Sequence, residues 1–170
     1  MSEERQEEQP LRMEIRGLML DPSSNAPIVV LRDEEGRVLL PIWIGLFEAN
    51  AIALQMENIS TPRPLTHDLL KSVVEELGGV VARILISDLK ENTFYARIYL
   101  VLDGQRELAV DSRPSDAIAL ALRTEAPIYV LPSVLEKARA IELTLQAGDE
   151  ERLKKWLEEV DPDDLGKYKM

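Results

Sequence analysis

The sequence predicts a single α+β domain built from two duplicated β-β-β-α units that share one mixed or antiparallel sheet, followed by C-terminal helices. Three observations predict this arrangement: an internal repeat, two hairpin patterns with turn residues between apolar runs, and one tetrapeptide that occurs in two helical segments. The length of 170 residues suits one hydrophobic core. Hydrophobic residues at 45% and charged residues at 30% are typical of globular proteins.

The repeat begins with an apolar run that ends in aspartate. Residues 16–21 (RGLMLD), followed by Asn25, recur as residues 83–88 (RILISD), followed by Asn92. Each unit later enters a helix with the sequence AIAL, at residues 51–54 and 117–120. Similar elements in the same order at both places indicate a duplication, whose halves must share one core.

Between these markers each unit contains a pattern typical of a β-hairpin. In the first unit, residues 28–31 and 38–40 are apolar and flank a turn at residues 33–36. In the second, residues 94–102 and 107–110 flank Asp103-Gly104. Asp-Gly between apolar runs is a strong hairpin signal, because glycine accepts the positive φ of a tight turn.

The remaining helices follow from caps and periodicity. Thr66 is the expected N-cap of a helix that ends at Gly78-Gly79, with an apolar stripe formed by Leu69, Leu70, Val73, Val74 and Leu77. Residues 127–130 read as a short strand, and a further helix runs from Ser133 to Arg139. A last amphipathic helix follows Asp149, with an apolar stripe formed by Leu153, Trp156, Leu157 and Val160.

These elements divide the chain into a disordered acidic tail at residues 1–10, a folded domain at 11–147, and a C-terminal amphipathic helix and tail at 148–170. We find no signal peptide and no apolar run of about 20 residues, so we expect a cytoplasmic protein without membrane contact. The absence of cysteine excludes disulfides and thiolate zinc sites. The net charge of −11 argues against a broad basic surface for nucleic acid.

Two polar segments stand out from the apolar framework, residues 63–68 (RPLTHD) and 111–116 (DSRPSD). Each places an arginine, an aspartate and a hydroxyl group at a helix N-terminus, where backbone N–H groups and the helix dipole attract anions such as phosphate. With one histidine and no cysteine, a metal site would be rich in oxygen, which favours magnesium, manganese or calcium.

A purely structural interpretation of both segments is also open. Ser112, Ser115 or Asp116 would cap the helix, Pro114 suits its first turn, and Arg113 would pair with Asp111. His67 and Asp68 would then be ordinary first-turn residues.

Three ordered motifs carry a resemblance to a known family. Residues 41–45 (PIWIG) with Glu48-Ala49, residues 63–70 (RPLTHDLL) and residues 111–120 (DSRPSDAIAL) resemble the pattern of the bifunctional nuclease (BFN) domain, over roughly residues 12–140. The resemblance implies an enzyme that hydrolyses phosphodiester bonds in both RNA and DNA, with nucleic acid as its partner. The folded domain at 11–147 would then be a BFN-like domain.

Chemistry suggests roles for the motif residues if the protein is a nuclease. The expected catalytic residues are His67, Asp68, Asp111 and Asp116, with Asp111 and Asp116 holding Mg²⁺ or Mn²⁺. His67 would act as general acid or base near neutral pH. The expected phosphate-binding residues are Arg63, Arg113 and Ser115. These roles require both segments to lie in one cleft.

The alternative hypothesis is a non-catalytic regulatory module that binds a phosphate-bearing ligand or a protein carboxylate. The acidic charge and the lack of a familiar catalytic signature favour it. We also expect a homo-oligomer, most simply a two-fold dimer, because Trp43, Phe47 and the last helix's stripe exceed what a monomer of this size readily buries.

Overall fold

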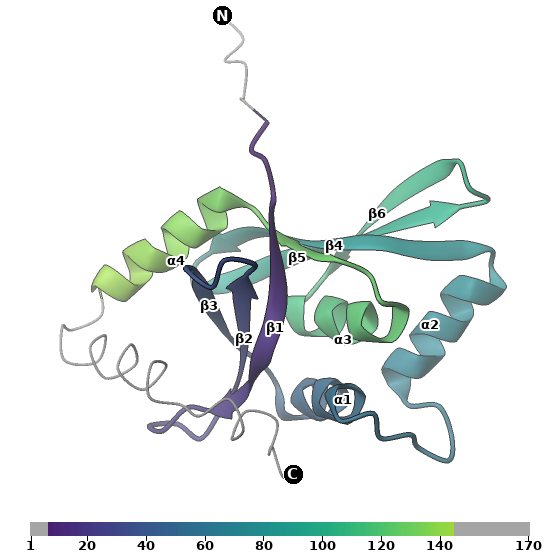
Figure 1. Cartoon of the computed structure of the whole chain (residues 1–170), viewed down its shortest axis with the longest axis horizontal. Coiled ribbons are helices and arrows are strands. Elements are labelled where there is room, and N and C mark those ends of the chain that lie inside the picture. Colours follow the sequence, from purple (N-terminus) through teal and green to yellow (C-terminus); the bar gives the residue numbers. More distant parts are fainter. Residues whose placement is uncertain (1–6, 145–170) are drawn as a thin grey trace, which may run out of the picture.

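The computed structural model describes residues 7–144, which form one mixed seven-stranded sheet and four helices, so the α+β prediction is confirmed (Figure 1). The strands are β1 (Leu11–Leu20), β2 (Pro27–Asp33), β3 (Leu39–Trp43), β4 (Gly79–Lys90), β5 (Thr93–Leu102), β6 (Arg106–Ser112) and β7 (Ile128–Val130). The helices are α1 (Leu46–Met56), α2 (Thr66–Glu76), α3 (Pro114–Thr124) and α4 (Pro132–Thr144).

The sheet has the order β3-β2-β1-β7-β4-β5-β6. Strands β1 to β3 and strands β4 to β6 each form an antiparallel meander, while β7 pairs antiparallel with β1 and parallel with β4. The turn between β5 and β6 contains Asp103 at φ 51° and Gly104 at φ 71°, which is the backbone that a tight hairpin requires. One β-β-β-α run therefore lies on each side of β7, although common descent of the two runs stays a prediction.

The core lies between the sheet and the helices that contain the repeated tetrapeptide. Ile52 in α1 and Ile118 in α3 are both fully buried, and the two helices pack against each other. Helices α1, α2 and α3 gather on one side of the sheet, whereas α4 lies apart from them against β4 (Figure 1). The two segments predicted to carry polar residues thus start neighbouring helices, because α2 also packs on α3.

The helix starts differ from the predicted caps. Leu65, not Thr66, is the N-cap of α2, and the Asp68 carboxylate accepts the Leu65 backbone N–H at 2.9 Å. Arg113 is the N-cap of α3, with Pro114 in its first turn as expected, and no side chain caps that helix. The aspartates in the first turns are therefore placed to make contacts of their own.

The apolar stripe of α2 is largely exposed. Leu69, Val73 and Leu77 are 56%, 46% and 73% exposed, and His67 is the buried residue of the helix. Phe47 at the start of α1 is 82% exposed. Exposed apolar surface of this kind is typical of interaction sites.

The homo-oligomer stays a prediction, now with a defined candidate surface. We expect the protein to form a dimer at micromolar concentration, because burying the α2 stripe removes its apolar side chains from water. Light scattering would measure the mass of the wild type and of a Leu69→Ser/Leu77→Ser variant, which should be monomeric. A wild type with the mass of one chain would contradict this expectation.

The predicted tail and C-terminal helix fall mostly beyond what the structure describes. The stripe formed by Leu153, Trp156, Leu157 and Val160 lies outside the described residues. Residues 7–10 precede β1, and the Glu8 carboxylate accepts the backbone N–H of Ser133 at 3.0 Å. The domain boundaries stay predictions. Within residues 7–144, no helix has the length and apolar character needed to cross a membrane.

Candidate functional site

A broad groove of about 1320 Å³ lies between α1, α2, the start of α3, and strands β5 and β6. Its walls are mainly apolar, and its polar side chains include Glu48, His67, Asp111, Arg113 and Asp116. Four of these five are residues that the sequence placed in a common site. The two polar segments therefore do meet in one groove, although they do not contribute every predicted side chain to it.

The central contact of the groove joins α2 to α3. Nε2 of His67 lies 2.9 Å from Oδ1 of Asp116, and the His67 residue is only 8% exposed. In the tautomer that carries its proton on Nε2, the imidazole donates this hydrogen bond to the Asp116 carboxylate. Nδ1 then keeps its lone pair whenever the imidazole is neutral.

Nδ1 of His67 keeps some contact with solvent. Within the described chain, no buried side-chain nitrogen or oxygen lacks a hydrogen-bond partner, and no protein group in that part bonds Nδ1. His67 lines the groove, so its imidazole is within reach of a bound molecule. The ring is held by a carboxylate at Nε2, while Nδ1 has no hydrogen-bond partner in the described part of the chain.

Arg113 extends this arrangement to α1. Its Nε donates to Oδ2 of Asp116 at 2.9 Å, and its Nη2 donates to Oε1 of Glu48. These bonds, first to Asp116 and then to Glu48, raise the pKa of the guanidinium above its usual value. The result is a continuous chain of contacts from Glu48 through Arg113 and Asp116 to His67. The Arg113–Asp111 pair of the purely structural interpretation is replaced by these two contacts.

The Asp68 carboxylate is not part of this series of contacts. It points to Arg123 in the last turn of α3. Its Oδ1 accepts from Nε of Arg123 at 2.7 Å, and the Arg123 side chain is only 4% exposed. The guanidinium also donates to the carbonyls of Ala119 at 2.8 Å and Ala51 at 3.0 Å. The Leu65 backbone N–H, and after it the Arg123 side chain, lower the pKa of the Asp68 carboxyl.

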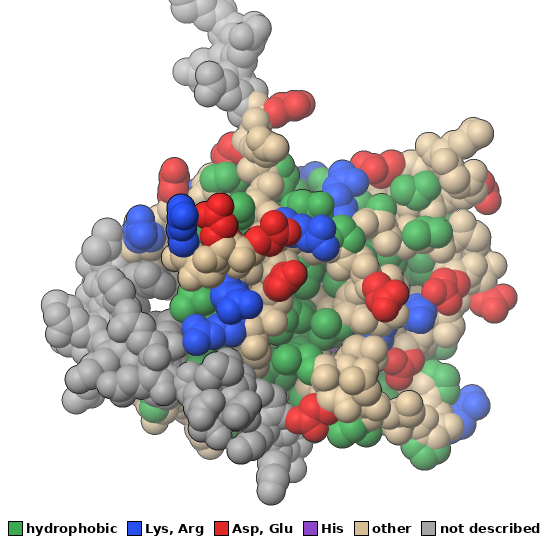
Figure 2. Space-filling view, in the orientation of Figure 1, with side chains coloured by type: hydrophobic (Ala, Val, Ile, Leu, Met, Phe, Trp, Pro, Cys, Tyr) green, Lys and Arg blue, Asp and Glu red, His purple; other side chains and the backbone are tan. Residues whose placement is uncertain are grey.

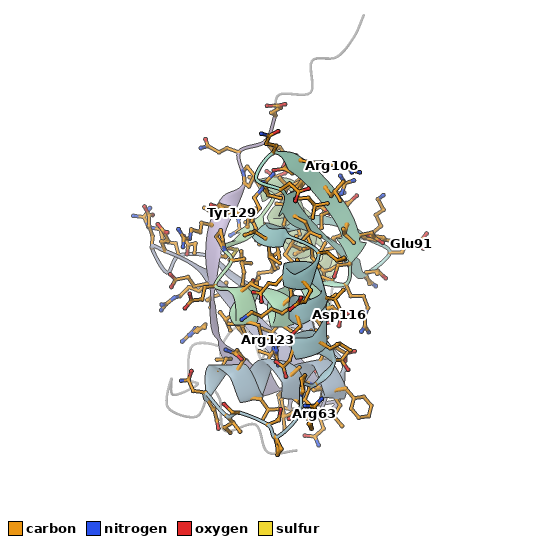
Figure 3. The ribbon with its side chains drawn as sticks, turned by 90° about the vertical axis from the view of Figure 1, so that its right-hand side faces the viewer. Arg63, Glu91, Arg106, Asp116, Arg123 and Tyr129 are labelled. Carbon is orange, nitrogen blue, oxygen red and sulfur yellow. The ribbon has the colours of Figure 1, made fainter. Side chains whose placement is uncertain are left out.

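Of the other predicted site residues, Asp111 lines the groove, whereas Arg63 and Ser115 do not. Arg63 is exposed in the turn before α2 and does not line the groove, and it lies toward the lower end of the molecule in Figure 3, below Asp116 and Arg123. Ser115 is only 5% exposed and so is buried in the first turn of α3. Asp111 is exposed at the end of β6, opposite Arg97 of β5. Phosphate contacts by Arg63 and Ser115 stay predictions.

Two residues of the site were missed by the sequence reasoning. Glu48 belongs to the first motif, yet its pairing with Arg113 crosses from α1 to α3 and has no signal in local spacing. Arg123 is a basic residue in the last turn of α3, where it resembles a residue that favours the helix dipole. The sequence offered one signal for Arg123, which is a charged residue within a helix that is otherwise buried.

The metal-ligating side chains do not match the predicted Mg²⁺ or Mn²⁺ site. In the part of the chain from residue 7 to 144, no group of three or more histidine, aspartate and glutamate side chains is placed to hold a metal. Both oxygens of Asp116 already bond cationic or N–H groups, one from His67 and one from Arg113. We therefore derive no chemical step through a metal, and dependence on a divalent ion stays a prediction.

An α+β domain that presents a carboxylate-oriented histidine and an arginine in an open groove has the constellation of an acid–base or anion-binding site. Comparison with known proteins gives the family. Residues 29–142 match the model of the bifunctional nuclease domain. The chain belongs to the bifunctional nuclease domain family.

Three relatives show how far the similarity extends. An uncharacterised protein of Mycobacterium tuberculosis is 40% identical over 158 residues, which cover 88% of this chain and 94% of that protein. Bifunctional nuclease 1 of Oryza sativa subsp. japonica is 33% identical over 118 residues, covering 68% of this chain and 36% of the rice protein. Bifunctional nuclease 2 of Arabidopsis thaliana is 30% identical over 105 residues, or 60% and 32% of the two chains.

Proposed function

We propose that this protein is a nuclease that hydrolyses phosphodiester bonds in RNA and DNA, with His67 as its general acid–base residue. The observation that carries the proposal is the contact between His67 and Asp116 in an open groove. Family membership supports the choice of phosphodiesters over other substrates, since relatives from rice and Arabidopsis are named bifunctional nucleases.

The proposed chemistry uses the two sides of the His67 ring differently. Asp116 holds Nε2–H, which fixes the ring orientation and stabilises the imidazolium that forms when Nδ1 takes a proton. Nδ1 removes a proton from the attacking oxygen and returns it to the leaving oxygen after the phosphorus–oxygen bond breaks. Proton transfer by a positioned side chain typically contributes a rate factor of about 10² to 10⁴.

Arg113 supplies positive charge beside His67. Its Nε and Nη2 bond Asp116 and Glu48, and no other residue from 7 to 144 accepts its remaining N–H groups, which can bind a phosphate. Its side chain is 64% exposed, so a phosphate reaches it without rearrangement of the fold. Asp111 at the groove wall is proposed as a second polar contact for substrate.

Cleavage assays on RNA and DNA test this function. Purified protein would be incubated with labelled single-stranded RNA and DNA, with Mg²⁺, Mn²⁺ or EDTA, beside Asp116→Asn and Asp111→Asn variants. We expect Asp116→Asn to lower the cleavage rate about 100-fold, because the amide does not stabilise the imidazolium. Asp103→Asn is the matched control, since it makes the same change in the turn at the other end of β6.

The outcomes separate the possible explanations. Cleavage that is unchanged in Asp116→Asn would contradict the proposed site and indicate a contaminant or another part of the chain. Cleavage that persists in EDTA would contradict the predicted dependence on Mg²⁺ or Mn²⁺, and cleavage that EDTA abolishes would support that dependence.

The negative net charge of the chain supports a second candidate function. The net charge of −11 disfavours broad contact with a polyanion, and acidic side chains are spread over much of the face in Figure 2. In this alternative the groove binds a small phosphate-bearing ligand or a protein carboxylate through Arg113 and no bond is cleaved. Absence of cleavage, together with a shift of the His67 imidazole signal on adding inorganic pyrophosphate, would favour it.

A further inference from the structure

Helix α2 carries the proposed acid–base residue but has few apolar anchors. His67 is its buried residue, while Leu69 and Val73 on the same helix and Leu77 at its C-cap are exposed. Val74 packs against the edge of the core. The position of α2 therefore depends on polar contacts at its first turn.

One of these contacts is made by the buried guanidinium of Arg123. It bonds a side chain of α2 and backbone carbonyls of α1 and α3, so one group connects all three helices that form the groove. Figure 3 shows Arg123 and Asp116 on α3 in the middle of the molecule. A cation with its side chain 4% exposed requires a counter-charge, and Asp68 provides it.

Asp68 also determines the start of α2. Its Oδ2 accepts the Leu65 N–H while its Oδ1 accepts from Arg123, so both oxygens are used. The next residue toward the N-terminus is His67. A carboxylate that joins the first turn of α2 to α3 thus controls where the adjacent imidazole lies relative to Asp116.

We propose that Asp68 and Arg123 are positioning residues that hold His67 against Asp116 in the groove. Asp68 accordingly does not touch the substrate, although it lies beside the acid–base residue in the sequence. This inference deepens the proposed function. It rests on that function only for its kinetic consequence, which is a lower kcat. The geometric consequence, which is the position of the imidazole, is measurable without any substrate.

The chain contains one histidine, so its imidazole gives a single, unambiguous signal in proton–carbon correlation spectra. We expect Asp68→Asn and Arg123→Lys to move the Cε1–H signal by more than its linewidth, in the direction in which Asp116→Asn moves it. Glu75→Gln is the matched control, because it also converts an acid to its amide on α2 but at an exposed site paired with Lys71. Its signal should remain at the wild-type position.

Kinetics provide the second measurement. Asp68→Asn should lower kcat about 10- to 100-fold with little change in KM, since a displacement on the order of 1 Å in a catalytic group has an effect of this size. Asp68→Glu, which keeps the charge, should recover part of the loss. If Asp68→Asn does not fold by circular dichroism, Arg123→Lys and Asp68→Glu still test the same contact.

The imidazole signal and the cleavage rate together separate the positioning role from the nuclease activity. An imidazole signal that stays at the wild-type position in both folded variants would overturn the positioning role, even if cleavage requires Asp116. A moved signal in a protein that cleaves neither RNA nor DNA would support positioning and refute the nuclease. Cleavage with an unchanged kcat in Asp68→Asn would leave the nuclease proposal intact and refute positioning.

Discussion

Replacing Arg123 with methionine is expected to lower the free energy of unfolding by about 3 kcal/mol. The methionine fills similar space but leaves the Ala51 and Ala119 carbonyls without their side-chain donor. It also leaves Asp68 without its cation. The Asp68 side chain is 35% exposed and regains some hydration, so the loss should lie at the low end of the range for broken buried pairs, about 3–5 kcal/mol.

Urea unfolding followed by circular dichroism measures this change, provided that the slope with denaturant stays constant. Arg97→Met is the control, because Arg97 is exposed on β5 and its replacement should change stability by less than about 0.5 kcal/mol. A loss below about 1 kcal/mol for Arg123→Met would show that the three-helix connection contributes little.

The pH dependence of this difference has a defined sign. Because the pKa of Asp68 is lowered in the folded protein, its stabilising contribution is present above the usual value of 3.8 and is lost as pH falls through the folded pKa. The difference in stability between wild type and Arg123→Met should therefore be largest at neutral pH. It should shrink in the acid range below the usual value, where Asp68 becomes protonated.

The sequence reveals the framework because its signals are local. Asp103-Gly104 predicts its hairpin because the turn needs positive φ, and the repeated AIAL segments predict buried helices because their small and branched side chains fit close packing. The hairpin and the two helices require no knowledge of distant contacts. The contact between His67 and Asp116 joins residues 49 positions apart, and the sequence predicted it only as a requirement of a shared cleft.

Local sequence signals do not predict the contacts between helices. Apolar periodicity predicts the stripe on α2 but not what covers it, and most of the stripe is exposed. Neighbouring residues on a helix point about 100° apart, so His67 faces Asp116 while Asp68 faces Arg123. The partners Glu48 and Arg123 depend on how α1, α2 and α3 pack, which residue spacing within one helix does not determine.

Replacing His67 with glutamine is expected to lower the rate of phosphodiester cleavage by a factor of about 10² to 10⁴, the usual contribution of general acid–base catalysis. The glutamine amide still donates to Asp116, so the contact with that carboxylate is kept, but the side chain does not accept and return a proton at neutral pH. The expected effect is therefore on kcat rather than on folding or on KM.

Steady-state rates on labelled single-stranded RNA and DNA measure this effect, with melting temperatures recorded on the same samples. Lys71→Gln is the matched control, because it introduces the same side chain on the exposed side of α2. It should cleave at the wild-type rate. A His67→Gln protein that keeps more than about a tenth of the wild-type kcat would place the proton transfer elsewhere. The groove would then act as a binding site, because Arg113 still offers N–H groups to an anion after the acid–base residue is lost.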